Sequence, residues 1–134
     1  MADWNQNVID EFRANEGKVG GMFEGANLLL LTHTGAKTGR QRVTPLVYAT
    51  DGDRLVIAAS KAGADTNPDW YHNLVANPKV TVEIGTDSAD ATATLVEDRA
   101  ERDRLYGLLS AHMPGFADYE KKTERLIPVF VLDR

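Results

Sequence analysis

The sequence predicts an α+β fold in which about six mostly antiparallel strands form a barrel with three or four peripheral helices. Short apolar runs follow one another at short intervals, which favours antiparallel pairing of consecutive strands. Asp51-Gly52 is a strong hairpin signal, because glycine takes a positive φ at no steric cost. Amphipathic patterns with helix-capping residues lie near the start and in the second half of the chain.

Length and composition indicate a single domain, residues 1–134, without thiol chemistry. The net charge of −5 disfavours non-specific nucleic-acid binding, yet a local basic patch could still hold one small polyanion. The chain has no cysteine, which excludes disulfides, thiolate metal sites and thiol catalysis. It shows neither a signal-peptide pattern nor an apolar run long enough to span a bilayer. We therefore expect a cytoplasmic protein, with peripheral membrane contact left open.

Residues 1–25 are predicted to form an N-terminal helix followed by a glycine-rich link. Trp4, Val8 and Phe12 repeat at helical spacing, with Ile9 beside them. We interpret this stripe first as a face that packs on the core. The open alternatives are a lid over a ligand pocket and a patch that rests on a membrane surface.

The next stretch is predicted to contain three strands. The run at residues 28–34 is typical of a buried strand, and residues 42–50 form a second one. Pro45 inside the second run indicates a sheet edge or a bulge, because proline cannot donate to the ladder. Residues 54–60 then pair antiparallel with the preceding strand across the hairpin turn.

A short helix is predicted after this hairpin, with Asn67 as its N-cap and Pro68 in its first turn. It ends near Ala76, before Asn77-Pro78. Asp98 is expected to cap a second helix. The remaining predicted elements are strands at 80–84 and 89–96, that helix from 99 to about 111, a helical turn at 118–123 and a last apolar strand at 127–132 that closes the sheet.

The turn after the first strand is basic in an acidic protein. It carries Lys37, Arg40 and Arg42 between and beside two glycines, and no acidic residue lies between Thr32 and Thr50. The glycine spacing does not fit a Walker A loop, and the turn is not a Rossmann fingerprint because no helix follows it. Backbone N–H groups and these cations suit a phosphate or carboxylates. The alternative is an ordinary solvated hairpin turn.

A second loop, Ser60-Lys61-Ala62-Gly63, has small residues that let a flat ring approach the backbone closely. Lys61 adds a fourth cation. If the two loops are neighbours, they form a groove suited to an aromatic cofactor with an anionic tail; otherwise they are two ordinary basic loops. Trp70 and Asn73 lie one helical turn apart and could add an apolar wall and an amide, although a core role is the commoner one for tryptophan.

Other catalytic patterns are missing. His33, His72 and His112 are scattered without metal-ligand spacing, so no metal site is expected. Ser60 lacks a nucleophile-elbow pattern, and no carboxylate pair suggests acid–base work. Such a protein either is not an enzyme or leaves the difficult chemistry to a cofactor.

Four blocks at residues 34–39, 42–46, 58–63 and 67–74 together resemble the deazaflavin-dependent nitroreductase family, whose members bind coenzyme F420, a flavin analogue. The similarity covers nearly the whole chain after about residue 25, and four blocks in one order are more specific than any one block. The matching blocks are Thr34-Gly35-Ala36-Lys37-Thr38-Gly39, Arg42-Val43-Thr44-Pro45-Leu46, Ala58-Ala59-Ser60-Lys61-Ala62-Gly63 and Asn67-Pro68-Asp69-Trp70-Tyr71-His72-Asn73-Leu74, with further agreement at Ala76-Asn77-Pro78-Lys79-Val80 and Arg125-Leu126-Ile127-Pro128.

The resemblance implies a split β-barrel like that of the pyridoxamine-phosphate oxidases, and it implies roles for the cofactor-binding residues. The phosphate and the oligoglutamate tail would be held by Lys37, Thr38, Arg42 and the backbone of Val43, Thr44 and Pro45. The deazaflavin ring would be lined by Ala58, Ala59, Ser60, Lys61, Ala62 and Gly63, and the pocket closed by Trp70 and Asn73.

The implied reaction is hydride transfer from reduced F420 to an electron-poor acceptor, with Ser60 or Tyr119 as candidate proton relays. Relatives that reduce nitro compounds place a tyrosine-rich segment over the substrate; here Met113, Phe116 and Tyr119 occupy it. This apolar segment favours quinones, enones and other activated double bonds over nitro compounds. The alternatives are an FMN-binding split-barrel oxidoreductase and a non-catalytic cofactor-binding module. Monomer and homodimer both remain open.

Overall fold

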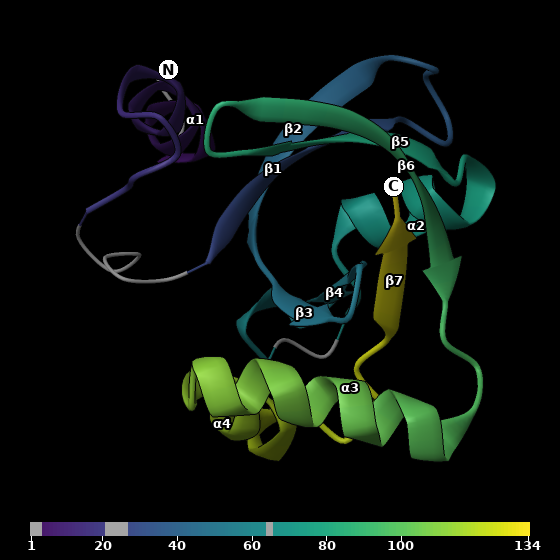
Figure 1. The fold of residues 1–134 in the computed structure, drawn as a ribbon. Helices are drawn as coiled ribbons and strands as arrows, with labels where there is room; N and C mark the ends of the chain where they lie inside the picture. Colours follow the sequence, from purple (N-terminus) through teal and green to yellow (C-terminus); the bar gives the residue numbers. More distant parts are fainter. Residues whose placement is uncertain (1–3, 21–26, 64–65) are drawn as a thin grey trace.

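The computed structural model describes residues 4–20, 27–63 and 66–134. In this part of the chain seven strands form one antiparallel sheet in the order β2-β1-β5-β6-β7-β4-β3 (Figure 1). The strands are β1 (Leu28–Thr34), β2 (Gln41–Val47), β3 (Ala49–Asp51), β4 (Arg54–Ala58), β5 (Lys79–Ile84), β6 (Asp87–Leu95) and β7 (Val129–Asp133). The helices are α1 (Trp4–Ala14), α2 (Asp69–Ala76), α3 (Arg99–His112) and α4 (Gly115–Lys122), with a 3₁₀ turn, η2 (Lys61–Gly63).

The two edge strands of the sheet are neighbours in the sequence. β2 ends at Val47 and β3 begins at Ala49, so only Tyr48 separates the opposite edges. The sheet must therefore curl on itself, and it forms a half-barrel (Figure 1). Pro45 lies in the edge strand β2, opposite Leu30 of β1, as its missing N–H predicts.

Buried side chains form three clusters that explain why β1 is apolar on both faces. Leu29 and Leu31 point into the barrel and pack in a cluster with Trp70 and Leu74 of α2. Leu28 and Leu30 point outward and are covered by α1, whose Val8, Ile9 and Phe12 are buried. The third cluster lies between the sheet and the helices α3 and α4; it contains Val56, Ala58, Leu105, Leu109, Phe116 and Val131.

The predicted α+β class and antiparallel pairing are confirmed, with corrections in detail. The single strand expected at 42–50 is divided at Tyr48, which gives seven strands in the described residues rather than about six. The last strand, β7, lies inside the sheet between β6 and β4. The helical turn expected at 118–123 begins earlier, because α4 starts at Gly115 and includes Phe116. Residues 21–25 of the predicted link and the side chain of Trp4 lie outside the described part.

The two predicted helix caps have different outcomes. Asp98 caps α3 as expected, and its carboxylate accepts the Glu101 N–H at 2.9 Å. The prediction of Asn67 as the N-cap of α2 is wrong, because Pro68 occupies that position without a side-chain cap. Asn67 has a long-range partner instead: its Oδ1 accepts from Arg125 Nη1 at 2.8 Å.

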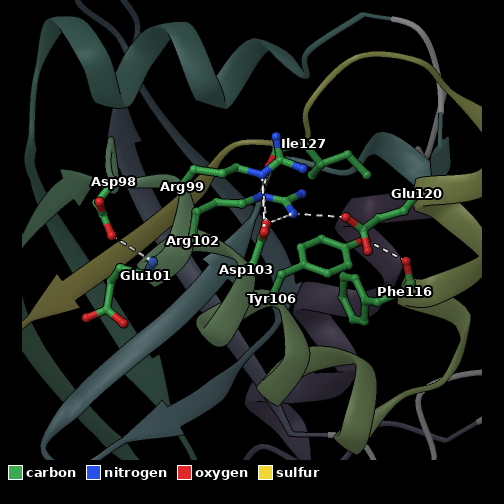
Figure 2. Close-up of polar contacts among 9 residues, drawn as sticks. All are labelled: Asp98, Arg99, Glu101, Arg102, Asp103, Tyr106, Phe116, Glu120 and Ile127. Carbon is green, nitrogen blue, oxygen red and sulfur yellow. Dashed lines mark hydrogen bonds and ion pairs between the residues drawn. The ribbon is translucent and has the colours of Figure 1, made fainter.

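A buried arginine joins the two helices at the end of the barrel. The Arg102 side chain is buried; its Nε donates to the Ile127 carbonyl at 3.0 Å and its Nη1 to Glu120 at 2.9 Å (Figure 2). Its guanidinium lies 4.6 Å from the centre of the Tyr106 ring. The Tyr106 hydroxyl donates to the Phe116 carbonyl at 2.6 Å. These contacts fix α4 against α3 and against the chain that leads into β7.

The backbone at Gly17 lies very close to the β5–β6 turn, which gives a testable prediction. Gly17 has φ +92°, and a Cβ there would lie 2.6 Å from the Gly85 Cα in the β5–β6 turn. We expect Gly17→Ala to destabilise the fold by about 2–4 kcal/mol, because strain and collision add. Gly52→Ala is the matched control: Gly52 has φ +62° with nothing within 4 Å of an added Cβ, so only about 1 kcal/mol is expected. Equal losses in urea unfolding would contradict the packing of this turn.

Candidate functional site

The β1–β2 turn is held by its own backbone. Gly35 N–H donates to the Arg40 carbonyl at 2.8 Å, and Gly39 N–H donates to the Gly35 carbonyl at 3.0 Å. A Cβ on Gly35 would lie 2.7 Å from Thr38 Oγ1, so a larger residue would displace that hydroxyl. The turn therefore presents Lys37 and its neighbours on a closed loop rather than on an open chain.

Helix α2 is joined to this turn through the buried side chain of Asn73. Its Oδ1 accepts the Ala36 N–H at 2.8 Å, and its Nδ2 lies 3.0 Å from His33 Nδ1. His33 is also buried, and its Nε2 lies 2.9 Å from Thr44 Oγ1 on β2. One hydrogen-bonded chain thus runs from the basic turn through α2 and β1 to β2.

Sequence reasoning missed His33, because it tested the histidines only as metal ligands. A usable signal was present in the strand pattern. Leu29, Leu31 and His33 alternate along β1 and share its inner face. A histidine that ends such an inward series is placed to bond with whatever packs inside the barrel, which here is α2.

Two adjoining pockets lie along this chain, and we call them together the hairpin groove. They share Arg42 and Asp69. The first has a volume of about 310 Å³ and is lined by Gly35, Ala36, Lys37, Thr38, Arg42, Asp69, His72 and Asn73. The second has a volume of about 320 Å³, adds residues of α1, and is lined by Gln6, Ile9, His33, Arg42, Val43, Thr44, Pro68, Asp69 and Trp70.

The groove favours an anionic ligand. Among the described residues, Lys37 and Arg42 of the groove and Arg40 of the same turn form no ion pair, and all three are exposed. Asp69 is the acidic residue that lines it. Burial, followed by the charge of Arg42, lowers the pKa of His33 to about 4, so its imidazole is neutral at physiological pH.

The second predicted loop is held by Arg125. The Arg125 Nη2 donates to the carbonyls of Ala59 and Ser60, at 3.1 and 2.9 Å. Gly63 has φ +84°, and a Cβ there would lie 2.9 Å from the Lys122 Cβ on α4. The loop therefore packs against α4, and Arg125 fixes its first carbonyls at the end of β4.

The structure brings one group of the predicted residues together in the hairpin groove, and the others do not line it. The residues that line the hairpin groove are Lys37, Thr38, Arg42, Val43, Thr44, Trp70 and Asn73. Pro45, Ala58 and Ala59 are buried in or next to their strands. Ser60, Lys61 and Gly63 line neither pocket of the groove, and the side chain of Ala62 lies outside the described part.

The residues predicted to cover the substrate belong to the end of the molecule built from α3 and α4. Phe116 is buried, and its ring packs edge-on against Tyr106 and Tyr119 with centroids 6.0 and 5.5 Å away. Met113 and Tyr119 are half-buried around the same cluster. Their role towards a substrate stays a prediction. No helix in the described part of the chain is long and apolar enough to cross a membrane.

Comparison with known proteins gives a consistent set of relatives. A family model described as F420H(2)-dependent quinone reductase matches residues 4–134. An F420H(2)-dependent quinone reductase of Mycobacterium tuberculosis (strain ATCC 25618 / H37Rv) is 40% identical over 126 residues, which cover 92% of this chain and 85% of that protein.

Solved structures agree with these relatives. A structure described as an F420-H2 dependent reductase is 39% identical, with a TM-score of 0.73, and the match covers 80% of this chain and 94% of that one. A second, described as a domain-swapped dimer, is 35% identical, with a TM-score of 0.75 and 95% and 96% coverage. A Listeria innocua protein assigned as a pyridoxamine 5'-phosphate oxidase shares only the fold, at 17% identity, a TM-score of 0.56 and 92% and 90% coverage, which confirms the split barrel.

Because buried His33 is neutral, we expect the free energy of unfolding to depend on pH. In the unfolded chain its pKa returns to about 6.5, so below that pH the unfolded state binds a proton that the native state excludes down to about pH 4. Stability should therefore fall as pH decreases through this window, by about 2 kcal/mol between about pH 7.5 and about pH 5. Urea unfolding of wild type and His33→Gln measures it. The variant should lose correspondingly less stability, and equal losses would show that His33 is not a buried neutral group.

Proposed function

The chain belongs to the F420H(2)-dependent quinone reductase family, and from this premise we propose how its residues hold the cofactor and present it to a quinone. The protein is an oxidoreductase that uses reduced coenzyme F420 as hydride donor and quinones as acceptors. Residues 1–134 act as one cofactor-binding domain in this proposal, because strands from both halves of the chain share a single sheet.

The hairpin groove holds the anionic part of the cofactor, its phosphate and oligoglutamate tail. The observation that carries this assignment is that Lys37 and Arg42 line one pocket and form no ion pair among the described residues. Arg42 can bind a phosphate through two parallel N–H groups, whereas Lys37 acts as a point charge. The Thr38 hydroxyl adds a neutral donor in the same pocket.

The segment from Ala58 to Gly63 lies beside the planar ring in this proposal. Small side chains and a backbone fixed by Arg125 support the assignment, because a flat ring needs a rigid surface that it can approach closely. When bound, reduced F420 supplies the hydride, and the protein supplies orientation and exclusion of water. Ser60 and Tyr119 are the candidate groups that deliver a proton to the product. Met113, Phe116 and Tyr119 border the acceptor.

The charge of the groove also distinguishes F420 from FMN. FMN carries one phosphate and no oligoglutamate, so it would leave part of the cationic set at Lys37, Arg40 and Arg42 without a partner. Each exposed cation that is left unmatched costs little, but each that meets a carboxylate adds to affinity and to its salt dependence. A cofactor with several negative charges therefore suits this surface better than one with a single phosphate.

Binding of F420, followed by its fluorescence, tests this assignment. We expect Lys37→Ala and Arg42→Ala each to weaken binding about tenfold and to reduce its salt dependence, because each removes one screened ionic contact. Arg99→Ala is the matched control: it also removes one exposed cation, but from α3, away from the groove, and should bind as wild type. Unchanged affinity in both groove variants would remove the groove from the cofactor site. Tight binding of FMN in place of F420 would contradict the cofactor assignment.

A further inference from the structure

The hydrogen bonds of Asn73 have a direction that the structure determines. The Ala36 backbone N–H can only donate, so the Asn73 atom that faces it at 2.8 Å must be the carbonyl oxygen. The other terminal atom is then the amide nitrogen, which can only donate. It lies 3.0 Å from His33 Nδ1, so Nδ1 must accept.

The direction of these hydrogen bonds also determines which nitrogen of the imidazole ring carries the proton. A neutral imidazole carries one proton, and because Nδ1 accepts, the proton must be on Nε2. The His33 Nε2–H then donates to Thr44 Oγ1 at 2.9 Å. The charged groups near this ring are Arg42 on β2 and Asp69 on α2, which line the same pocket; burial and the charge of Arg42 keep His33 neutral.

The chain of hydrogen bonds ends at the Thr44 hydroxyl. Its oxygen accepts from His33, so its O–H can donate to another acceptor. Among the described residues, no acceptor for that hydrogen is found. Thr44 and Arg42 are two residues apart on β2, so their side chains share one face, and both line the second pocket of the hairpin groove. A hydroxyl hydrogen is therefore directed into the groove beside a guanidinium.

We propose that the Thr44 hydroxyl donates a hydrogen bond to a phosphate oxygen of the bound cofactor, with His33 and Asn73 as positioning residues that fix the direction of that bond. The phosphate is favoured over other oxygens because Arg42 lies beside Thr44 and Lys37 lines the adjoining pocket. The proposal rests on the proposed function for its ligand. The direction of the bonds inside the protein does not depend on any ligand.

The first test reads the imidazole in the protein without cofactor. Long-range ¹H–¹⁵N NMR of His33 at neutral pH should show the proton on Nε2 and a bare Nδ1. A proton on Nδ1, or on both nitrogens, would overturn the proposed direction whatever the protein binds. This arm is independent of the cofactor assignment.

The second test measures F420 affinity in a series of variants. Thr44→Val keeps the shape of the side chain and should bind about tenfold more weakly, and Thr44→Ser should recover most of that loss. His33→Phe should weaken binding less than Thr44→Val, and should add nothing to it in the double variant, because His33 acts through Thr44. Thr50→Val, on the exposed face of β3, is the control for exchanging threonine, and thermal unfolding checks that each variant folds.

The outcomes separate this proposal from the proposed function. Wild-type affinity in Thr44→Val, or additive losses in the double variant, would overturn the proposal while F420 binding by the wild type stands. Failure of the wild type to bind F420 would overturn the proposed function and the ligand half of this proposal, and would leave the NMR result intact. An equal loss for the deazaflavin that carries only its ribityl chain, and therefore lacks the phosphate, would overturn the assignment of the acceptor to the phosphate.

Discussion

The side-chain amide of Asn73 joins three parts of the molecule that are far apart in the sequence. It accepts from the basic turn at Ala36, donates to His33 on β1, and belongs to the helix α2 inside the half-barrel. Such a buried amide is costly unless every polar atom is satisfied, so its two partners constrain each other. Together with the β1–β2 ladder, this amide therefore holds the cationic turn against the barrel interior.

The curl of the sheet explains why the site lies where it does. Because only Tyr48 separates β2 from β3, the edge strand β2 is fixed at the opening of the half-barrel, between α1 and α2. The free edge of β2 supplies Arg42 and Thr44 to the groove, while α2 closes it from inside. This hairpin thus gathers three exposed cations that form no ion pair among the described residues, Lys37, Arg40 and Arg42, and in the proposed function they attract the anionic cofactor.

Features that depend on adjacent residues could be predicted from the sequence, whereas features that depend on contacts between distant residues could not. The Asp51-Gly52 hairpin and the Asp98 cap were predictable because a turn and a cap depend on adjacent residues. The role of Asn67 was not, because its partner Arg125 lies 58 residues away. The inward position of His33 could have been predicted from the strand pattern, but its partner Asn73 could not, because that bond exists only after α2 packs inside the barrel. The packing of the Ser60–Gly63 loop on α4 likewise follows from tertiary contacts.

In the proposed arrangement, the hairpin groove binds the anionic part of the cofactor while the loop after β4 faces its ring. A crystal structure of the protein with coenzyme F420 would show both contacts at once. We expect the phosphate within hydrogen-bonding distance of the Arg42 guanidinium and the ring beside Ser60. A cofactor bound in the groove of about 570 Å³ that Thr32, Thr81 and Asp90 help to line would contradict it.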